Sequence, residues 1–226
     1  MIFLLTVSLQ GQELHQKVHL DLSMDMEYLM YLPEGYDKDA EEDYPMLVYL
    51  HGGGGGESIE YARRGGPPSI IKEGKRFPFI VLCPYNPEPK KYWNDYALIA
   101  LIDKIIDTHA VDTTKVYLAG MSRGAYGAWR LAIDYPAYFA ALVVASGVTP
   151  TAYGYALWIK ELPIWVFHGT EDDAIPFRES VEMVEALERA EAKVRFTPLE
   201  GMGHSIRQEV FDRVEIYEWM LTHSKK

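Results

Sequence analysis

Residues Lys115–Gly124 (KVYLAGMSRG) are followed by Ala125–Asp134 (AYGAWRLAID), and together they predict a strand, a sharp turn and a helix. The apolar run Lys115–Ala119 is typical of a buried strand, and Ser122 stands between two glycines where the strand ends. Such a turn leaves no room for side chains two residues to either side, and it pushes the central side chain out of the backbone with strained dihedral angles. The pattern predicts a nucleophile elbow with Ser122 as the candidate nucleophile.

Strand-like and helix-like segments alternate on both sides of this stretch, which is typical of a mostly parallel sheet with helices on both faces. The expected strands are Met46–Leu50, Phe79–Leu82, Lys115–Ala119, Ala140–Ala145, Ile164–Phe167 and Val194–Leu199. The expected helices are Asp95–His109, Ala125–Asp134, Glu179–Ala190 and Ile206–Leu221. His15–Leu32 alternates with period two and predicts one or two antiparallel edge strands. No repeat or linker interrupts this order, so we expect residues 1–226 to form one α/β domain.

The connection after the strand Ala140–Ala145 is short. Residues Ser146–Leu162 alone separate it from the next parallel strand, and part of this segment must form the crossover helix. An independent lid domain has no room there. We therefore expect a minimal cap and an open cleft over Ser122.

The composition excludes several classes of partner. The chain has a net charge of −11, whereas nucleic acid and anionic membranes require a basic face. No apolar run approaches the roughly 18 residues that span a bilayer. The single cysteine, Cys83, rules out an intrachain disulfide, and neither a Gly-Lys-Ser/Thr phosphate loop nor a metal-ligand cluster is present in the sequence. We expect no nucleic-acid partner, no membrane span, no cofactor and no metal, in a monomer or a small homo-oligomer.

Residues 1–12 allow two interpretations. Met1–Leu9 is apolar, but the first Lys or Arg is Lys17, and a functional signal peptide has a basic segment before a longer apolar region. The stretch is therefore either the remnant of a signal peptide or an edge strand. We expect a cytoplasmic protein, with export as the alternative if the stretch is such a remnant.

A serine hydroxyl becomes a good nucleophile only when a base takes its proton and an acid orients that base. In sheets with this kind of elbow the acid follows the serine in the chain, and the histidine comes last. The loop His168–Pro176 (HGTEDDAIP) follows a predicted strand and contains three candidate acids, Glu171, Asp172 and Asp173. The histidine that opens the loop precedes these acids, so we interpret it as a structural residue.

The candidate base is His204, in the glycine-flanked loop Glu200–His204 after the last predicted strand. The carboxyl ends of parallel strands meet at one edge of a sheet, which would bring this loop to the elbow. The only later histidine, His223, lies in the polar tail after the final helix. His204 therefore occupies the position that the chain order requires.

Two backbone N–H groups should stabilise the charge that develops on an attacked carbonyl oxygen. One is expected from Arg123, the residue after the serine. The other is expected from the loop His51–Gly56 (HGGGGG), whose bare backbone a substrate can approach closely. We assign this second donor to Gly53, with Gly54 as the next candidate.

Aromatic residues in the loops near the elbow are candidates for the substrate pocket. Trp93 follows the proline-rich loop Pro84–Pro89 at the carboxyl edge of the sheet, which favours a lining role for Trp93 and its neighbour Tyr92. Gly54 of the glycine loop would join them. For Tyr153, Tyr155 and Trp158, packing and substrate contact are equally open. An aromatic wall beside an open cleft suits a small acyl group with a variable alcohol, aryl alcohols included.

Three parts of the sequence together resemble the α/β-hydrolase superfamily. They are KVYLAGMSRG with the following Ala125–Phe139, the loop HGTEDDAIP and the loop GMGH. Within this superfamily they most resemble the lidless carboxylesterases related to feruloyl esterases, polyhydroxybutyrate depolymerases and dienelactone-hydrolase-like "predicted peptidase" proteins. The resemblance runs from about Tyr28 to the last helix. It implies an α/β-hydrolase fold with the nucleophile at Ser122, the acid at Asp172, the base at His204, and oxyanion donors at the backbones of Gly53 and Arg123.

The resemblance also implies a serine carboxylesterase that hydrolyses short-chain acyl esters through an acyl-enzyme. A serine peptidase or a thioesterase with the same triad is the alternative, and a catalytically silent binding module is a more distant one. Dienelactone hydrolases use a cysteine nucleophile, so the serine argues against that activity. Where the relatives commonly have Ser-Met-Gly-Gly, this chain has Ser122–Ala125 (SRGA), so the Arg123 side chain could alter the pocket or pair with a carboxylate.

Overall fold

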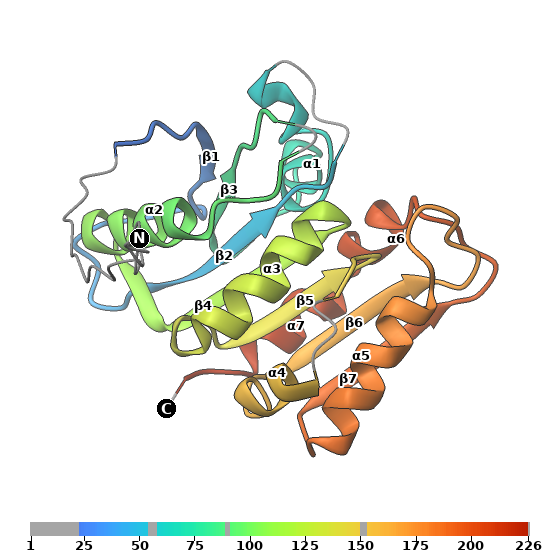
Figure 1. Cartoon of the computed structure of the whole chain (residues 1–226). Coiled ribbons are helices and arrows are strands. Elements are labelled where there is room, and N and C mark those ends of the chain that lie inside the picture. Colours follow the sequence, from blue (N-terminus) through green and yellow to red (C-terminus); the bar gives the residue numbers. More distant parts are fainter. Residues whose placement is uncertain (1–22, 54–57, 89–90, 150–152, 226) are drawn as a thin grey trace, which may run out of the picture.

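The computed structural model describes residues 23–53, 58–88, 91–149 and 153–225. These residues form one seven-stranded sheet with the order β1-β3-β2-β4-β5-β6-β7 (Figure 1). The strands are β1 (Tyr28–Tyr31), β2 (Tyr44–Leu50), β3 (Ile80–Pro84), β4 (Val111–Met121), β5 (Ala141–Ala145), β6 (Ile164–Gly169) and β7 (Val194–Leu199). Every neighbouring pair is parallel except β1 and β3, so the mostly parallel sheet is confirmed.

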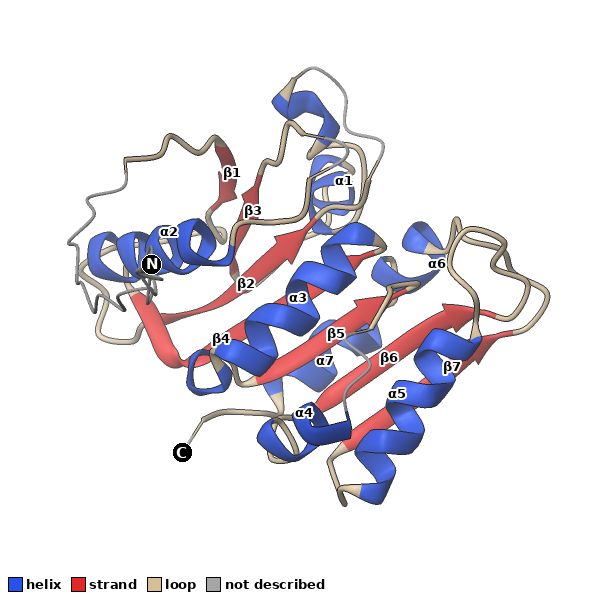
Figure 2. Cartoon of the chain, in the orientation of Figure 1, coloured by secondary structure: helices blue, strands red, loops and turns tan. Residues whose placement is uncertain are grey.

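Helices cover both faces of this sheet, as predicted (Figures 1 and 2). The helices are α1 (Pro67–Lys72), α2 (Asp95–Thr108), α3 (Arg123–Asp134), α4 (Tyr153–Trp158), α5 (Arg178–Arg189), α6 (Arg207–Phe211) and α7 (Val214–Leu221). Two short 3-10 helices, η1 (Ile59–Tyr61) and η2 (Pro136–Tyr138), lie in connections. The helices α2, α3, α4 and α5 pack on one face of the sheet, and α1, α6 and α7 pack on the other.

The strand β2 illustrates why the central strands are continuous apolar runs. Met46, Val48 and Leu50 enter the hydrophobic cluster on one face of the sheet. Leu47 and Tyr49 enter the cluster on the other face. Because successive side chains of a strand point to opposite faces, a strand with helices on both sides must be apolar at every position.

The prediction of a single closing helix over Ile206–Leu221 is wrong. The segment forms α6 and α7, and Arg213 between them has an extended backbone with φ −75° and ψ 115°. The Phe211 carbonyl accepts a hydrogen bond from the buried Tyr217 hydroxyl at 2.7 Å. This bond satisfies a carbonyl group at the end of α6, where the intrahelical partner is missing.

The edge-strand prediction over His15–Leu32 is confirmed only in part. Among the described residues of that segment, Tyr28–Tyr31 forms the antiparallel edge strand β1, paired with β3. Residues 1–12, assigned above to a signal remnant or an edge strand, lie outside the described residues. The short helix α1 was not predicted, because it follows the glycine loop and begins with two prolines.

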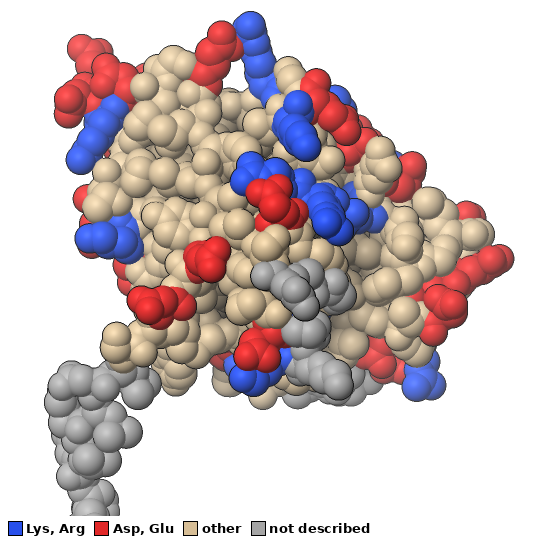
Figure 3. Space-filling model, turned by 90° about the horizontal axis from the view of Figure 1, so that it is seen from above, with Lys and Arg blue, Asp and Glu red and all other residues tan. Residues whose placement is uncertain are grey.

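The carboxyl ends of the parallel strands meet along one edge of the sheet, at the top of Figure 1. Figure 3 shows this face of the molecule from above. Lys and Arg side chains gather near its middle, and most Asp and Glu side chains lie toward its margin. Within the described part of the chain, no helix has the length and apolar character needed to cross a bilayer.

Candidate active site

Ser122 lies at the junction of β4 and α3 with a backbone conformation that is rare for a residue other than glycine. Its φ is 55° and its ψ is −121°. Its amide donates a hydrogen bond to the Ala145 carbonyl at the end of β5, at 2.8 Å. The bond ties the turn to the neighbouring strand and holds the strained serine at the carboxyl edge of the sheet.

The two glycines of the pattern are required by close backbone contacts. A Cβ atom on Gly120 would lie 2.3 Å from the Gly124 carbonyl oxygen. A Cβ atom on Gly124 would lie 1.9 Å from the carbonyl oxygen of Leu50 in β2. Neither position can take a side chain unless the backbone moves, so the glycine spacing follows from the geometry of this turn.

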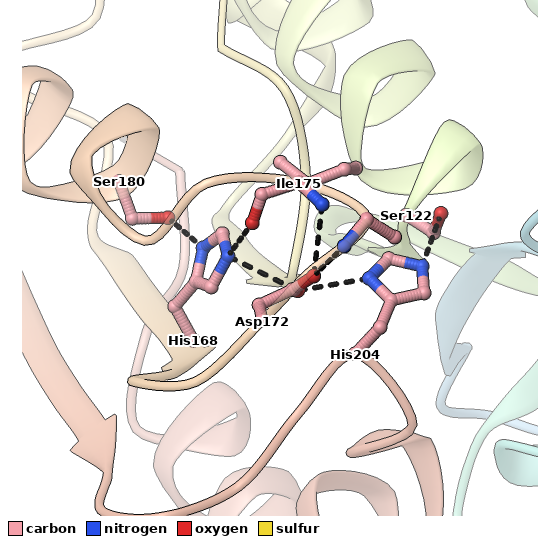
Figure 4. Close-up of polar contacts among 7 residues, drawn as sticks. Ser122, His168, Asp172, Ile175, Ser180 and His204 are labelled. Carbon is pink, nitrogen blue, oxygen red and sulfur yellow. Dashed lines mark hydrogen bonds and ion pairs between the residues drawn. The ribbon is translucent and has the colours of Figure 1, made fainter.

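Hydrogen bonds join Ser122, His204 and Asp172 in one chain (Figure 4). His204 Nε2 lies 2.9 Å from Ser122 Oγ, and His204 Nδ1 lies 2.8 Å from Asp172 Oδ2. Because Nδ1 faces a carboxylate oxygen, we assign the imidazole proton to Nδ1, which leaves Nε2 free to accept the serine proton. The Asp172 side chain is fully buried and that of His204 is 27% exposed, so the base reaches the surface while the acid does not.

The Asp172 carboxylate is held in its ionised form by hydrogen bonds. Burial alone would raise its pKa, but the hydrogen bonds from the Ile175 amide and from His204 outweigh that effect and lower the pKa. Oδ1 accepts from the Ala174 amide at 3.0 Å and from the Ile175 amide at 2.8 Å. The other two candidate acids, Glu171 and Asp173, are exposed. The structure thus brings only the middle one of the three carboxylates to the histidine.

A second histidine contacts the same carboxylate. His168 is fully buried, and its Nε2 lies 3.2 Å from Asp172 Oδ2 and 3.0 Å from the Ile175 carbonyl oxygen. Its Nδ1 lies 2.7 Å from Ser180 Oγ. Burial lowers the pKa of His168, so it is neutral, with Nε2 as the donor and Nδ1 as the acceptor. Sequence reasoning assigned this histidine to structure but missed its contact with the acid, four residues later in the chain.

The glycine loop passes directly beside the elbow. A Cβ atom on Gly52 would lie 3.2 Å from the Met121 carbonyl oxygen and 3.4 Å from Ser122 Cβ. At Gly53 a Cβ atom would meet nothing within 4 Å, so this residue borders open space. Gly54, the other candidate donor and pocket residue, lies outside the described residues.

The Arg123 side chain contacts backbone carbonyls. Its Nη1 donates to the carbonyl oxygens of Glu88 and of Lys91, the latter at 3.1 Å. Its Nη2 lies 3.3 Å from the Gly52 carbonyl oxygen and 3.5 Å from that of Asn86. Among the residues that the structure describes, no carboxylate pairs with Arg123.

Trp93 is a core residue rather than a wall of the pocket. The indole is 3% exposed and packs edge-on against the His51 ring at a centroid distance of 5.0 Å. A Cβ atom on Gly127 of α3 would lie 2.7 Å from Trp93 Cδ1, so the indole fills the space left by that glycine. Tyr92 is 66% exposed, and its ring lies 4.9 Å from that of Tyr126. The sequence signal that could have indicated this burial is Gly127, a glycine inside a predicted helix, which leaves space for a large neighbouring side chain.

Two of the later aromatic residues, Tyr155 and Trp158, lie away from the elbow, and the side chain of the third, Tyr153, lies outside the described residues. Trp158 in α4 is exposed and borders a surface hollow together with Pro163 and Lys193, which directly precede β6 and β7. These positions are the amino ends of the strands, whereas Ser122 lies at the carboxyl ends. Tyr155 packs against Trp158 with ring centroids 5.3 Å apart. Among the described residues, no group of three or more histidine, cysteine and acidic side chains could hold a metal ion.

The sheet order and the place of the serine after β4 define an α/β-hydrolase fold. The chain belongs to the phospholipase/carboxylesterase family, whose family model matches residues 93–219, more than half of the chain. Among curated proteins no sequence matches this chain.

Solved esterase structures are similar to this fold. A thermostable esterase is 25% identical with a TM-score of 0.74, over 88% of this chain and 60% of that protein. This chain therefore spans less than two thirds of that esterase's length. A ferulic acid esterase from Anaeromyces mucronatus, in complex with ferulic acid, is 16% identical with a TM-score of 0.64, over 88% of this chain and 90% of that protein. Esterase 2 of Thermogutta terrifontis, phosphorylated by paraoxon, is 17% identical with a TM-score of 0.61, over 81% of this chain and 80% of that protein.

Proposed function

We propose that the protein is a serine carboxylesterase. The observation that carries the proposal is the unbroken chain of hydrogen bonds from Ser122 through His204 to the buried Asp172. Membership of the phospholipase/carboxylesterase family supports the same reaction class.

In the proposed first half-reaction, Ser122 Oγ attacks the ester carbonyl carbon while His204 Nε2 takes the hydroxyl proton. The carbonyl oxygen becomes an oxyanion, which the N–H groups of Gly53 and Arg123 stabilise. The Asp172 carboxylate holds the imidazole and stabilises its positive charge. His204 then gives the proton to the leaving alkoxide, the carbon–oxygen bond breaks, and the alcohol departs from an acyl-enzyme.

The second half-reaction repeats these steps with water. His204 takes a proton from a water molecule, which attacks the acyl carbon, and a second oxyanion forms at the same N–H groups. The bond to Ser122 Oγ breaks, the serine recovers its proton from His204, and the carboxylic acid departs. Every proton that moves passes through His204 Nε2, the ring nitrogen that faces Ser122.

The proposed substrates are esters of short acyl chains, with an aryl group on either side accepted. The described helix in the connection from β5 to β6 is α4, which lies near the amino ends of the strands and does not cover Ser122. We therefore expect no long tunnel for an acyl chain. The fold shared with a ferulic acid esterase supports testing aromatic acids.

The test of the reaction is Ser122→Ala, assayed with p-nitrophenyl acetate and p-nitrophenyl butyrate. We expect kcat to fall by at least about 10⁴-fold, since removal of a serine nucleophile has effects of this order. A fluorophosphonate or paraoxon should label the wild-type protein at Ser122, as detected by peptide mass spectrometry. Ser224→Ala, in the exposed tail, is the matched control and should leave both readouts unchanged.

Two results would contradict the proposal. One is full esterase activity in a folded Ser122→Ala variant, and the other is a folded wild-type protein that neither turns over nor is labelled. Esters from acetate to octanoate, methyl ferulate, a thioester and a peptidyl amide complete the panel. We expect short-chain esters to have the highest kcat/KM. A preference for octanoate would overturn the short-chain assignment, and a preference for the amide or the thioester would make the protein a peptidase or a thioesterase.

A further inference from the structure

We propose that the Arg123 side chain is a positioning residue for the second oxyanion donor. It supplies one N–H group of the oxyanion hole from its backbone, and with its guanidinium it fixes the peptide that carries the other. The inference rests on the proposed esterase function and assigns a role to the arginine that stands beside the nucleophile.

One peptide group joins Gly52 to Gly53 and couples their polar groups. The carbonyl of Gly52 and the N–H of Gly53 belong to one planar trans peptide, so they point in opposite directions. Any group that holds the Gly52 carbonyl oxygen therefore sets the direction of the Gly53 N–H. Two donors converge on that oxygen, Arg123 Nη2 at 3.3 Å and His51 Nδ1 at 2.9 Å.

His51 can serve as a donor because its other ring nitrogen is occupied. The Asn86 amide donates to His51 Nε2 at 3.1 Å, which places the imidazole proton on Nδ1. Burial lowers the pKa of His51 to about 4, so the ring stays neutral and this tautomer persists at neutral pH. Trp93 packs against the ring from one side and restrains it further.

An arginine suits this position because one planar group can hold several carbonyls. The guanidinium ties the Gly52 carbonyl to the carbonyls of Asn86, Glu88 and Lys91, which belong to the neighbouring loop. A loop of consecutive glycines has no side chains of its own to restrict it, so it depends on such external contacts. A methionine at this position would have no donor for these carbonyls.

The same contacts argue against a direct role in substrate binding. Both Nη atoms donate to backbone carbonyls. Nε has no hydrogen-bond partner among the described residues, but it is buried, so a substrate cannot reach this donor. The effect of the guanidinium on the reaction should pass through the Gly52–Gly53 peptide, and it should appear in the transition state rather than in ground-state binding.

The experiment compares Arg123→Met with Arg123→Lys, both of which keep the backbone N–H of residue 123. With p-nitrophenyl butyrate we expect Arg123→Met to lower kcat about tenfold with KM changed less than about twofold, because a weakened oxyanion hole acts on the transition state. The affinity for an alkyl trifluoromethyl ketone, which adds to the serine and forms an oxyanion, should fall by a similar factor. Arg123→Lys should not restore kcat, because an ammonium is a single point donor.

The exposed Arg189→Met on α5 serves as the matched control, with kcat and ketone affinity unchanged. Unchanged kcat and ketone affinity in Arg123→Met would overturn the inference, as would a raised KM with normal kcat or full rescue by lysine. If Arg123→Met does not fold, Arg123→Lys must by itself show the loss in kcat and ketone affinity. The outcomes separate from the proposed function: a wild-type protein that fluorophosphonate does not label refutes the esterase, whereas an active wild type with an unimpaired Arg123→Met variant refutes this inference alone.

Discussion

The loop that carries the acid and the loop that carries the glycines lie at the same edge of the sheet, but different parts of the chain hold them. In the acid loop, Asp172 receives hydrogen bonds from amides two and three residues later and from the histidine four residues earlier. In the glycine loop, the Gly52 carbonyl accepts from the Arg123 side chain, 71 residues away in the chain. Nearer contacts come from His51 to the Gly52 carbonyl and from Tyr61 to the Gly53 carbonyl, and the backbone N–H of Asn86 orients the His51 ring from 35 residues away.

The two loops differ in whether the residues that fix their geometry are near or distant in the chain. Three of the four groups that contact the Asp172 carboxylate lie within the nine residues of its own loop, so the position of this carboxylate should survive changes elsewhere. The geometry of the glycine loop depends on helix α3 and on the loop after β3, so changes in distant residues should reach it. Substitutions in the two regions can therefore be compared directly.

The largest effect is expected from Asp172→Asn, which changes the acid loop from within. Asparagine keeps an acceptor for the amides of Ala174 and Ile175, so we expect the fold to persist. The amide cannot stabilise the imidazolium or fix its tautomer, and kcat should fall by about 10⁴-fold. Kinetics with p-nitrophenyl acetate, together with a thermal melt, measure both expectations.

The matched control for this substitution is Asp173→Asn, next to the acid in the chain but exposed. We expect kcat to change less than about twofold. If Asp173→Asn removed the activity and Asp172→Asn did not, the assignment of the acid would be wrong, and so would the view that the loop is organised around Asp172.

The same contrast explains which parts of the molecule could be predicted from sequence. The strand β7 has the predicted bounds, and α2 ends one residue earlier than predicted, because hydrophobic periodicity reflects burial on the sheet directly. Ser122 and His204 were found because each follows a strand in a fixed chain order, and the parallel sheet brings those strand ends together. The same order led only to the loop with three acids, and the resemblance to the α/β-hydrolase superfamily selected Asp172 among them.

The features that sequence reasoning missed depend on tertiary contacts. Trp93 was predicted to line the pocket because the sequence places it after a strand at the carboxyl edge of the sheet. The sequence does not show that the indole fills the space beside Gly127. The guanidinium of Arg123 could have paired with a carboxylate, and only the fold shows that backbone carbonyls surround it. The break between α6 and α7 depends on the Tyr217 hydroxyl reaching Phe211. None of these contacts leaves a periodic signal.

A second prediction concerns the pH dependence of stability that the glycine loop introduces. Burial lowers the pKa of His51 from 6.5 to about 4, so below pH 6.5 the unfolded chain binds a proton that the folded protein does not. The free energy of unfolding should therefore decrease as the pH falls from about 6.5 to about 4, by about 3 kcal/mol at most for this group. Urea unfolding at pH 7.5, 5.5 and 4.5 measures the decrease.

The control for this prediction is His51→Gln, whose amide can replace the donor to Gly52 but does not titrate. His168 has a pKa lowered in the same direction by burial, and it remains in both proteins. The difference between the two pH profiles therefore isolates His51. Parallel profiles would show that the pKa of His51 is the same in the folded and the unfolded protein, which would contradict the neutral, buried ring that we assign to His51.

The smallest effect is expected from Tyr61→Phe, which removes the hydroxyl that donates to the Gly53 carbonyl. That carbonyl belongs to the peptide after Gly53, so Tyr61 restrains the loop without holding the peptide that carries the Gly53 N–H. The lost hydrogen bond contributes about 1 kcal/mol, and only part of this loss should affect the position of the Gly53 N–H. We therefore expect kcat to fall about threefold, less than in Arg123→Met. The ring should still pack against His51, with which it makes an edge-on contact at 5.2 Å.

The double variant Arg123→Met/Tyr61→Phe, assayed with p-nitrophenyl butyrate, then decides how the glycine loop is held. If both side chains restrain one loop, their effects on kcat should not multiply, because the first loss already frees the backbone that the second contact restrains. Independent effects would mean that each contact acts on its own peptide. A larger loss from Tyr61→Phe than from Arg123→Met would make the Gly53 carbonyl, rather than that of Gly52, the point that sets the oxyanion hole.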